Sequence, residues 1–128
     1  MLENMQQNTV TLIGAMATDV VLTTTDEGVA LARFRIIVSN RRLDRRTSTW
    51  VNSEPSFLAV ACWRRLAENV AGSLQRGDPV LVTGRLKVRS VQRNGRPTTY
   101  VEVEASSVGP DLNRTTATLA RVSRTVAA

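Results

Sequence analysis

Residues 85–104 read RLKVRSVQRNGRPTTYVEVE, and this stretch decides the fold because it specifies one long β-hairpin. Asn94-Gly95 separates two alternating runs, and both residues tolerate the positive φ of a two-residue type I′ turn. A turn at this point sets which residues face each other across the two arms. The predicted pairs are Arg93–Arg96, Arg89–Tyr100, Lys87–Glu102 and Arg85–Glu104 on one face, with Val88–Val101 and Leu86–Val103 on the other. One face is therefore expected to join the core, while the other carries the charges.

The charged face of this hairpin divides into a base and a tip. At the base we expect Arg85 to pair with Glu104 and Lys87 to pair with Glu102. Each exposed pair of this kind contributes only ~0.2–1 kcal/mol. Towards the tip, three arginines have no acid opposite them: Arg89, Arg93 and Arg96. Like charges that face each other are unfavourable, so the tip is expected to bind an anionic partner.

The composition restricts the class of that partner. The chain has 128 residues, enough for one domain with a single core. With 17 Lys and Arg against 11 Asp and Glu, its formal charge is +6 and its isoelectric point is near 11.2. This charge suits a polyanion, with nucleic acid as the first candidate and an acidic membrane surface as the second. No stretch is long enough and apolar enough to cross a bilayer.

Groups that serve catalysis or bind metals are scarce. The chain has no histidine, which is the commonest general base and the commonest transition-metal ligand. It also lacks a Cys-x-x-Cys pair, a glycine-rich phosphate loop and a Gly-x-Ser-x-Gly motif. We therefore predict no enzyme activity and no cofactor or metal. The single cysteine, Cys62, indicates a reducing cytoplasm; its apolar neighbours favour a buried thiol, with an intersubunit disulfide as the alternative.

Short β-rich runs make up most of the chain. We expect strands over residues 8–16, 19–25, 29–40, 57–63 and 79–86, the last leading into the hairpin. The run 63–78 is the one clear helix, with apolar residues at four-residue spacing and Gly77 as a left-handed C-terminal cap. Three strands, a helix and two further strands are typical of the OB-fold, so we predict an all-β fold with a five-stranded barrel and one helix between the third and fourth strands.

Residues 41–56 are polar, turn-rich and basic, and we interpret them as a loop between strands. Within residues 41–46 lie four arginines and one aspartate. A solvated loop is the simpler interpretation, but four arginines beside Trp50 favour a track for phosphates.

The run FLAVACW, residues 57–63, has two different faces. One face is expected in the core and consists of Leu58, Val60 and Cys62. The other face has Phe57 and Trp63 at its ends and only alanines between them, which leaves a shallow floor for a flat group. A second buried layer in an oligomer explains the same pattern nearly as well.

In order from about residue 8 to residue 112, the chain contains NTVTLIG, RFRIIVSNRR, SEPSFLAVACWRRLAENV, LQRGDPVLVTGRL and a hairpin ending in YVEVEA. Together these segments resemble the bacterial single-stranded-DNA-binding protein family. The following segment, VGPDLNRTTATLARVSRT, is similar to the actinobacterial branch, in which an additional strand after the barrel clamps a neighbouring subunit.

The resemblance implies a single-stranded-DNA-binding domain over residues 1–112 and a C-terminal extension over residues 113–128 that supplies the clamp strand. It also implies a cytoplasmic, nucleoid-associated homotetramer that binds and protects single-stranded DNA, without reading sequence, during replication, recombination or repair. The alternative is a primosomal or modulatory OB-fold assembly protein whose aromatic face binds a protein partner. The family typically continues into a glycine-rich linker and an acidic tip that recruits replication and repair enzymes. This chain ends in RVSRTVAA, so we expect a short paralogue without that recruiting tail.

The resemblance also carries over individual binding positions. Family aromatics stack on bases at the positions of Phe57 and Trp63, while two further family tryptophan positions fall on Leu43 and Val91; Trp50 is the candidate substitute. The predicted nucleic-acid-binding residues are Arg33, Arg35, Arg41, Arg42, Trp50, Phe57, Trp63, Arg65, Arg76, Lys87, Arg89 and Arg93. With fewer stacking positions, binding should depend more on phosphate contacts.

Overall fold

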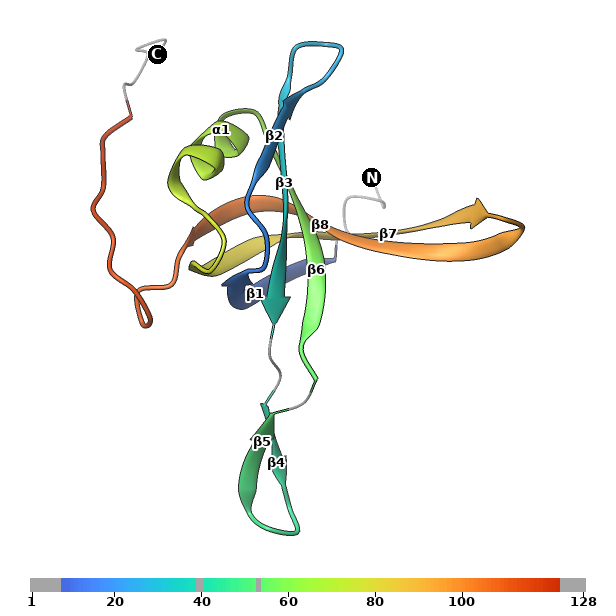
Figure 1. Cartoon of the computed structure of the whole chain (residues 1–128), viewed down its shortest axis with the longest axis vertical. Helices are drawn as coiled ribbons and strands as arrows, with labels where there is room; N and C mark the ends of the chain where they lie inside the picture. Colours follow the sequence, from blue (N-terminus) through green and yellow to red (C-terminus); the bar gives the residue numbers. More distant parts are fainter. Residues whose placement is uncertain (1–7, 39–40, 53, 123–128) are drawn as a thin grey trace.

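The computed structural model describes residues 8–38, 41–52 and 54–122, with the side chains of residues 41–44 and 50–52 left out. In chain order, the elements are β1 (Thr9–Met16), β2 (Val21–Thr24), β3 (Ala30–Val38), β4 (Arg41–Asp44), β5 (Thr49–Asn52), β6 (Ser56–Trp63), α1 (Arg64–Ser73), β7 (Pro79–Arg93) and β8 (Arg96–Pro110). Figure 1 shows two hairpins, β4–β5 and β7–β8, projecting from the body of the molecule in different directions.

Five strands close into a ring of pairings. The sheet order is β1-β7-β8-β6-β3-β2, and β1 pairs with β3 as well as with β7. The second pairing of β1 joins Ala15 to Ile37 and Met16 to Ile36. All pairings are antiparallel except the short parallel pairing of β6 with β8. This arrangement, with one helix after the third ring strand, is the OB-fold that the sequence predicts.

The hairpin register predicted from Asn94-Gly95 is confirmed. Arg85 lies opposite Glu104, and the pairing continues in step to Arg93 opposite Arg96. Asn94 and Gly95 have φ values of 53° and 76°, as a type I′ turn requires.

The apolar face of this hairpin is only partly buried. Val103 is fully buried and Leu86 packs against the core, but Val88 and Val101 remain exposed. The reason is that the outer half of the hairpin extends beyond the ring, where no second layer of the described chain covers it (Figure 1). The expectation of a continuous core face is therefore wrong for this half.

The core fills the ring and the space beneath α1. Alternate residues of β3, namely Ala32, Phe34 and Ile36, point inward and are buried. They meet Val60 and Cys62 of β6, as predicted, together with buried valines from β7 and β8. The Cys62 side chain is fully buried, and this burial raises the pKa of its thiol to about 11. The buried-thiol interpretation of Cys62 is confirmed.

Two expected element boundaries are wrong. Residues 41–56 are expected to be a loop, but within them β4 and β5 form a separate two-stranded sheet around a turn at residues 45–48. Helix α1 covers Arg64–Ser73 rather than residues 63–78, because Leu74 is already extended with φ −120° and ψ 149°. Gly77 does have a positive φ of 95°, but it lies in the turn after the helix, where its N–H donates a hydrogen bond to the Met16 carbonyl.

The segment after β8 is anchored at its start. Asp111 is buried, and its carboxylate accepts hydrogen bonds from the Asn113 backbone N–H at 3.0 Å and from Arg114 Nε at 3.1 Å. Arg114 Nη2 in turn donates to the Gly14 carbonyl at 2.8 Å. Residues 115–122 then form neither helix nor strand in the structure, and they run past α1 (Figure 1). Within the described residues, no helix is long and apolar enough to cross a membrane.

Gly84 offers a test of how closely β7 and β8 approach each other. It lies at an irregularity in their pairing, and an added Cβ would meet the Glu104 carbonyl oxygen and lie 2.7 Å from Ala105 Cα. Gly84→Ala is therefore expected to lower the free energy of unfolding by ~1–3 kcal/mol, because the two strands must separate. Urea unfolding followed by circular dichroism measures this. Gly109→Ala in the same strand pair is the control, since its Cβ would meet nothing within 4 Å; equal effects of the two changes would contradict the close approach.

Candidate nucleic-acid interface

The solvent-facing side of β3, β6, β7 and β8 collects most of the predicted binding residues. On β3, Arg33 and Arg35 alternate with buried residues and are exposed. On β6, Phe57 is 53% exposed and Trp63 is 37% exposed, although both are large and aromatic. We call this side the outer face; it carries Arg33, Arg35, Phe57, Ala59, Ala61, Trp63, Arg85, Lys87, Arg89, Arg93, Tyr100, Glu102 and Glu104.

The strand registers align the outer face in rows that cross the sheet. One row runs through Arg33, Ala61, Glu104 and Arg85. The next runs through Arg35, Ala59, Glu102 and Lys87. Each row thus places an arginine at one end, an alanine and a glutamate in the middle, and a second basic residue at the other end.

The alanines between the two aromatics are less exposed than expected. Ala59 is half-buried, and Ala61 is only 3% exposed. Ala61 is covered because Arg33 and Glu104 flank it in the register. The exposed surface therefore concentrates at the two ends of β6, where Phe57 and Trp63 lie.

Acidic side chains neutralise the base of the hairpin, and of the two predicted ion pairs Arg85–Glu104 is confirmed. Glu104 accepts hydrogen bonds from Arg85 and, at 3.0 Å, from Lys87 Nζ. These two bonds, that from Arg85 first, hold the pKa of Glu104 below its usual value. Glu102 lies instead 3.7 Å from Arg33 Nε. Lys87 and Glu102 do face each other in the register, but the predicted ion pair between them is wrong, because the long lysine side chain reaches diagonally to Glu104.

The tip of the hairpin keeps its positive charge. Arg89, Arg93 and Arg96 are exposed, and none forms an ion pair within the described residues. Arg93 nevertheless has a partner, since its guanidinium carbon lies 6.0 Å from the centroid of the Tyr100 ring. Tyr100 was missing from the predicted site. The hairpin register already placed it opposite Arg89 on the charged face, and that signal was sufficient to include it.

The remaining predicted residues lie away from this cluster. Arg65 is exposed on α1, and Arg76 lies in the turn between α1 and β7, at the opposite end of β7 from the hairpin tip. The structure therefore does not bring Arg76 together with Arg89 and Arg93. Arg41, Arg42 and Trp50 lie on the β4–β5 hairpin, which projects from the ring (Figure 1), but their side chains fall outside the described part of the chain.

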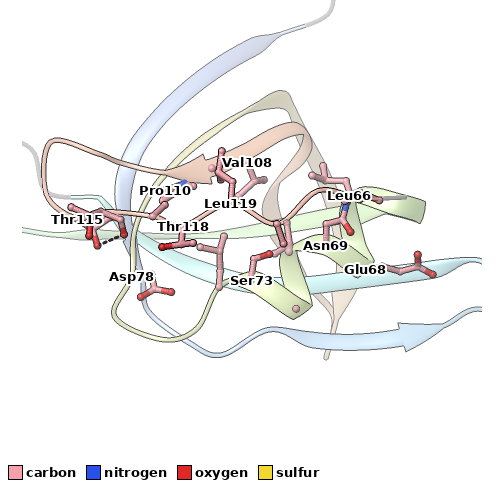
Figure 2. Close-up of a pocket in the computed structure, with 18 residues that line it drawn as sticks. Leu66, Glu68, Asn69, Ser73, Asp78, Val108, Pro110, Thr115, Thr118 and Leu119 are labelled. Atoms are coloured by element: carbon pink, nitrogen blue, oxygen red, sulfur yellow. Dashed lines mark hydrogen bonds between the residues drawn. The ribbon is translucent and has the colours of Figure 1, made fainter. Parts of the chain in front are cut away.

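Surface hollows adjoin these elements. One of about 790 Å³ lies between α1 and residues 115–122 rather than on the outer face, and Figure 2 shows Leu66, Val108 and Leu119 among the residues that line it. A smaller groove of about 310 Å³ adjoins Trp63. Among the described residues, no cluster of His, Cys, Asp or Glu could hold a metal ion.

Known proteins of one family are similar to this chain. The model of the family described as "Single-strand binding protein family" matches residues 7–111. The chain is 44% identical over 117 residues to the single-stranded DNA-binding protein of Mycolicibacterium smegmatis, covering 91% of this chain and 71% of that protein. It is 43% identical over 117 residues, with the same coverage, to the single-stranded DNA-binding protein of Mycobacterium tuberculosis.

Two solved structures are also similar. The crystal structure of the small single-stranded DNA-binding protein from Streptomyces coelicolor superposes with a TM-score of 0.74 at 37% identity, covering 86% of this chain and 99% of that chain. The second single-stranded DNA-binding protein of Mycobacterium smegmatis superposes with a TM-score of 0.67 at 30% identity, covering 90% of this chain and 99% of that chain.

Glu104→Gln tests the charge pairing at the hairpin base. Because the folded-state pKa of Glu104 is depressed, its ion pairs contribute stability above the usual value of 4.5, and this stability is lost as the pH falls through the folded pKa. We expect Glu104→Gln to lower the free energy of unfolding at pH 7 by about 1 kcal/mol or less. The difference from the parent should shrink near pH 3. Urea unfolding at both pH values measures this, with Glu68→Gln on the exposed side of α1 as the charge-matched control; a difference that grows on acidification would refute the pairing.

Proposed function

Because the chain belongs to the bacterial single-strand binding protein family, we propose that it binds single-stranded DNA through the outer face and does not read its sequence. In this role it covers exposed strands during replication, recombination or repair. The protein acts as a binding module and not as an enzyme.

The exposure of two aromatic side chains on one strand carries the proposal. Phe57 and Trp63 lie on the same face of β6. The neighbouring strand β3 places Arg33 and Arg35 beside that face. A base stacked on such a ring contributes ~1–3 kcal/mol, and every base has a flat face to offer. Bases that stack on these two rings, with arginines beside them, therefore support tight DNA binding that tolerates any base sequence.

Phosphate contacts follow from the distribution of the unpaired cations. Arg33, Arg85 and Lys87 already have acidic partners, so they are partly neutralised before a strand binds. Arg35 and Arg89 have none in the described residues, and we assign them, with the hairpin tip, to the phosphate backbone. Arg93, whose guanidinium lies over the Tyr100 ring, is assigned to the same phosphate contacts.

We propose that the working form is a homotetramer in which residues 113–128 of each subunit form the extension that contacts a neighbour. In the single chain, Leu119 is 87% exposed and Val122 is 57% exposed. The 790 Å³ hollow between α1 and this segment supports the same idea, because the segment packs loosely on its own subunit (Figure 2). The exposed Val88 and Val101 of the hairpin are further candidates for burial between subunits. As a DNA-binding protein the assembly is proposed to reside in the cytoplasm with the nucleoid.

A titration with fluorescent oligo-dT at rising salt tests the proposed function. Binding should quench the fluorescence of the two tryptophans, Trp50 and Trp63, and the affinity should fall steeply with salt. Binding of neither oligo-dT nor other single strands would instead favour the alternative, an assembly module whose aromatic face binds a protein.

Trp63→Ala tests the stacking role. We expect it to weaken oligo-dT binding by ~1–3 kcal/mol, because one base loses its stacking surface. Leu112→Ala removes another exposed apolar side chain, away from the outer face, and should leave the affinity unchanged. Fluorescence anisotropy gives the affinities, and circular dichroism checks that each variant is folded. An unchanged affinity for folded Trp63→Ala would exclude stacking at this position.

Deletion of residues 115–128 tests the extension while sparing the Asp111–Arg114–Gly14 anchor. We expect a lower melting temperature, a weaker dependence of melting on protein concentration, and retained strand binding. In the full chain, Leu119→Asp should produce the same loss, because its side chain is exposed in one subunit and would be buried only by a neighbour. Differential scanning calorimetry and analytical ultracentrifugation measure both; the same number of subunits and the same melting temperature for all three proteins would contradict the intersubunit role.

A further inference from the structure

Arg64 adopts a left-handed backbone conformation at the junction between β6 and α1. Its φ is 62°, whereas Trp63 directly before it is extended, with φ −119° and ψ 149°. Ser48 and Asn94 are the other non-glycine residues with positive φ in the described chain, and both lie in hairpin turns. A side chain with a Cβ is strained in this region, so Arg64 calls for its own explanation.

The junction explains the backbone of Arg64 but not its side chain. β6 ends at Trp63 and α1 begins at Arg64, so the chain must change from extended to helical without a linker. The positive φ makes this change within one residue. Glycine adopts that conformation without strain, and asparagine adopts it more readily than arginine does. An arginine at this point is therefore the least favourable of the three for folding alone.

The surroundings of Arg64 indicate what its side chain contributes. Arg64 is exposed and, among the residues described, forms no ion pair. It lines the 310 Å³ groove beside Trp63, together with Thr25, Glu27, Val29 and Glu104. Glu104 is already occupied by Arg85 and Lys87. An available guanidinium thus adjoins the exposed indole of Trp63.

We infer that Arg64 is a further nucleic-acid-binding residue, which contacts the phosphate of the nucleotide whose base stacks on Trp63. This inference rests on the proposed function. The planar guanidinium offers two parallel N–H donors to a phosphate and keeps its charge at every physiological pH. The strained conformation is retained because Trp63 and Arg64 are consecutive, so one junction positions both the stacking surface and the cation.

Arg64→Gly separates the two effects in opposite directions. Removal of the strain should raise the melting temperature, since glycine is the residue that the backbone conformation favours. Removal of the phosphate contact should weaken oligo-dT binding and reduce the slope of log K against log[salt] by about 0.7, the value for one contact to a single strand. A melting temperature that falls, or a salt slope equal to that of the parent, would overturn the inference.

Two further variants distinguish a contact from a general charge effect. Arg64→Lys keeps both the charge and the strained backbone, so its salt slope and melting temperature should stay near those of the parent. Gln75→Glu lowers the net charge by one in the exposed turn after α1 and should change the slope less than Arg64→Gly does. Equal slopes for Gln75→Glu and Arg64→Gly would reduce Arg64 to a contribution to net charge and would overturn the contact.

The same series separates this inference from the proposed function. If the parent does not bind oligo-dT, the proposed function fails, and the inference fails with it. If the parent binds and Trp63→Ala weakens binding while Arg64→Gly keeps the parent affinity and salt slope, only the assignment of Arg64 fails.

Discussion

The double pairing of β1 is the constraint on which the rest of the structure depends. β1 pairs with β7 from Thr9 to Ala15 and, at its end, with β3, and this second pairing closes the ring. Gly14 makes the approach possible, because an added Cβ would meet the Ile37 carbonyl oxygen. Once the ring is closed, every strand must turn alternate residues inward, and the remaining residues form a continuous outer surface. The position of the aromatic and basic side chains is thus a consequence of ring closure.

The outer face combines a neutralised centre with charged margins. Glutamates of β8 lie in the middle of the crossing rows and bind Arg33, Arg85 and Lys87. The unpaired arginines lie beyond them, on β3 and towards the hairpin tip. This distribution limits repulsion among the basic residues in the folded protein. It also leaves positive charge at the edges of the outer face, where a bound DNA strand would pass beyond the β-sheet. The same cross-strand contacts therefore serve stability and the electrostatic profile of the surface.

The sequence predicted those features that follow from local pattern. Asn94-Gly95 set the hairpin register, and alternation on β6 separated Cys62 from Trp63 correctly. Contacts that depend on the third dimension were not predictable in this way. The diagonal reach of Lys87 to Glu104 depends on side-chain length and on the position of Arg33. The β4–β5 hairpin forms a sheet apart from the ring, so no apolar alternation reveals it. The left-handed Arg64 gave no signal, because arginine is not a residue that marks such a turn.

Cys62 has a consequence for how the protein responds to oxidants and alkylating reagents. The thiolate is the reactive form of cysteine, and burial raises the pKa of this thiol to about 11, so almost none is present near neutral pH. The side chain is also fully enclosed by the ring. A thiol reagent can therefore reach Cys62 only when the ring opens. The rate at which Cys62 is chemically modified therefore reports how often the ring opens, and this measurement needs no added label.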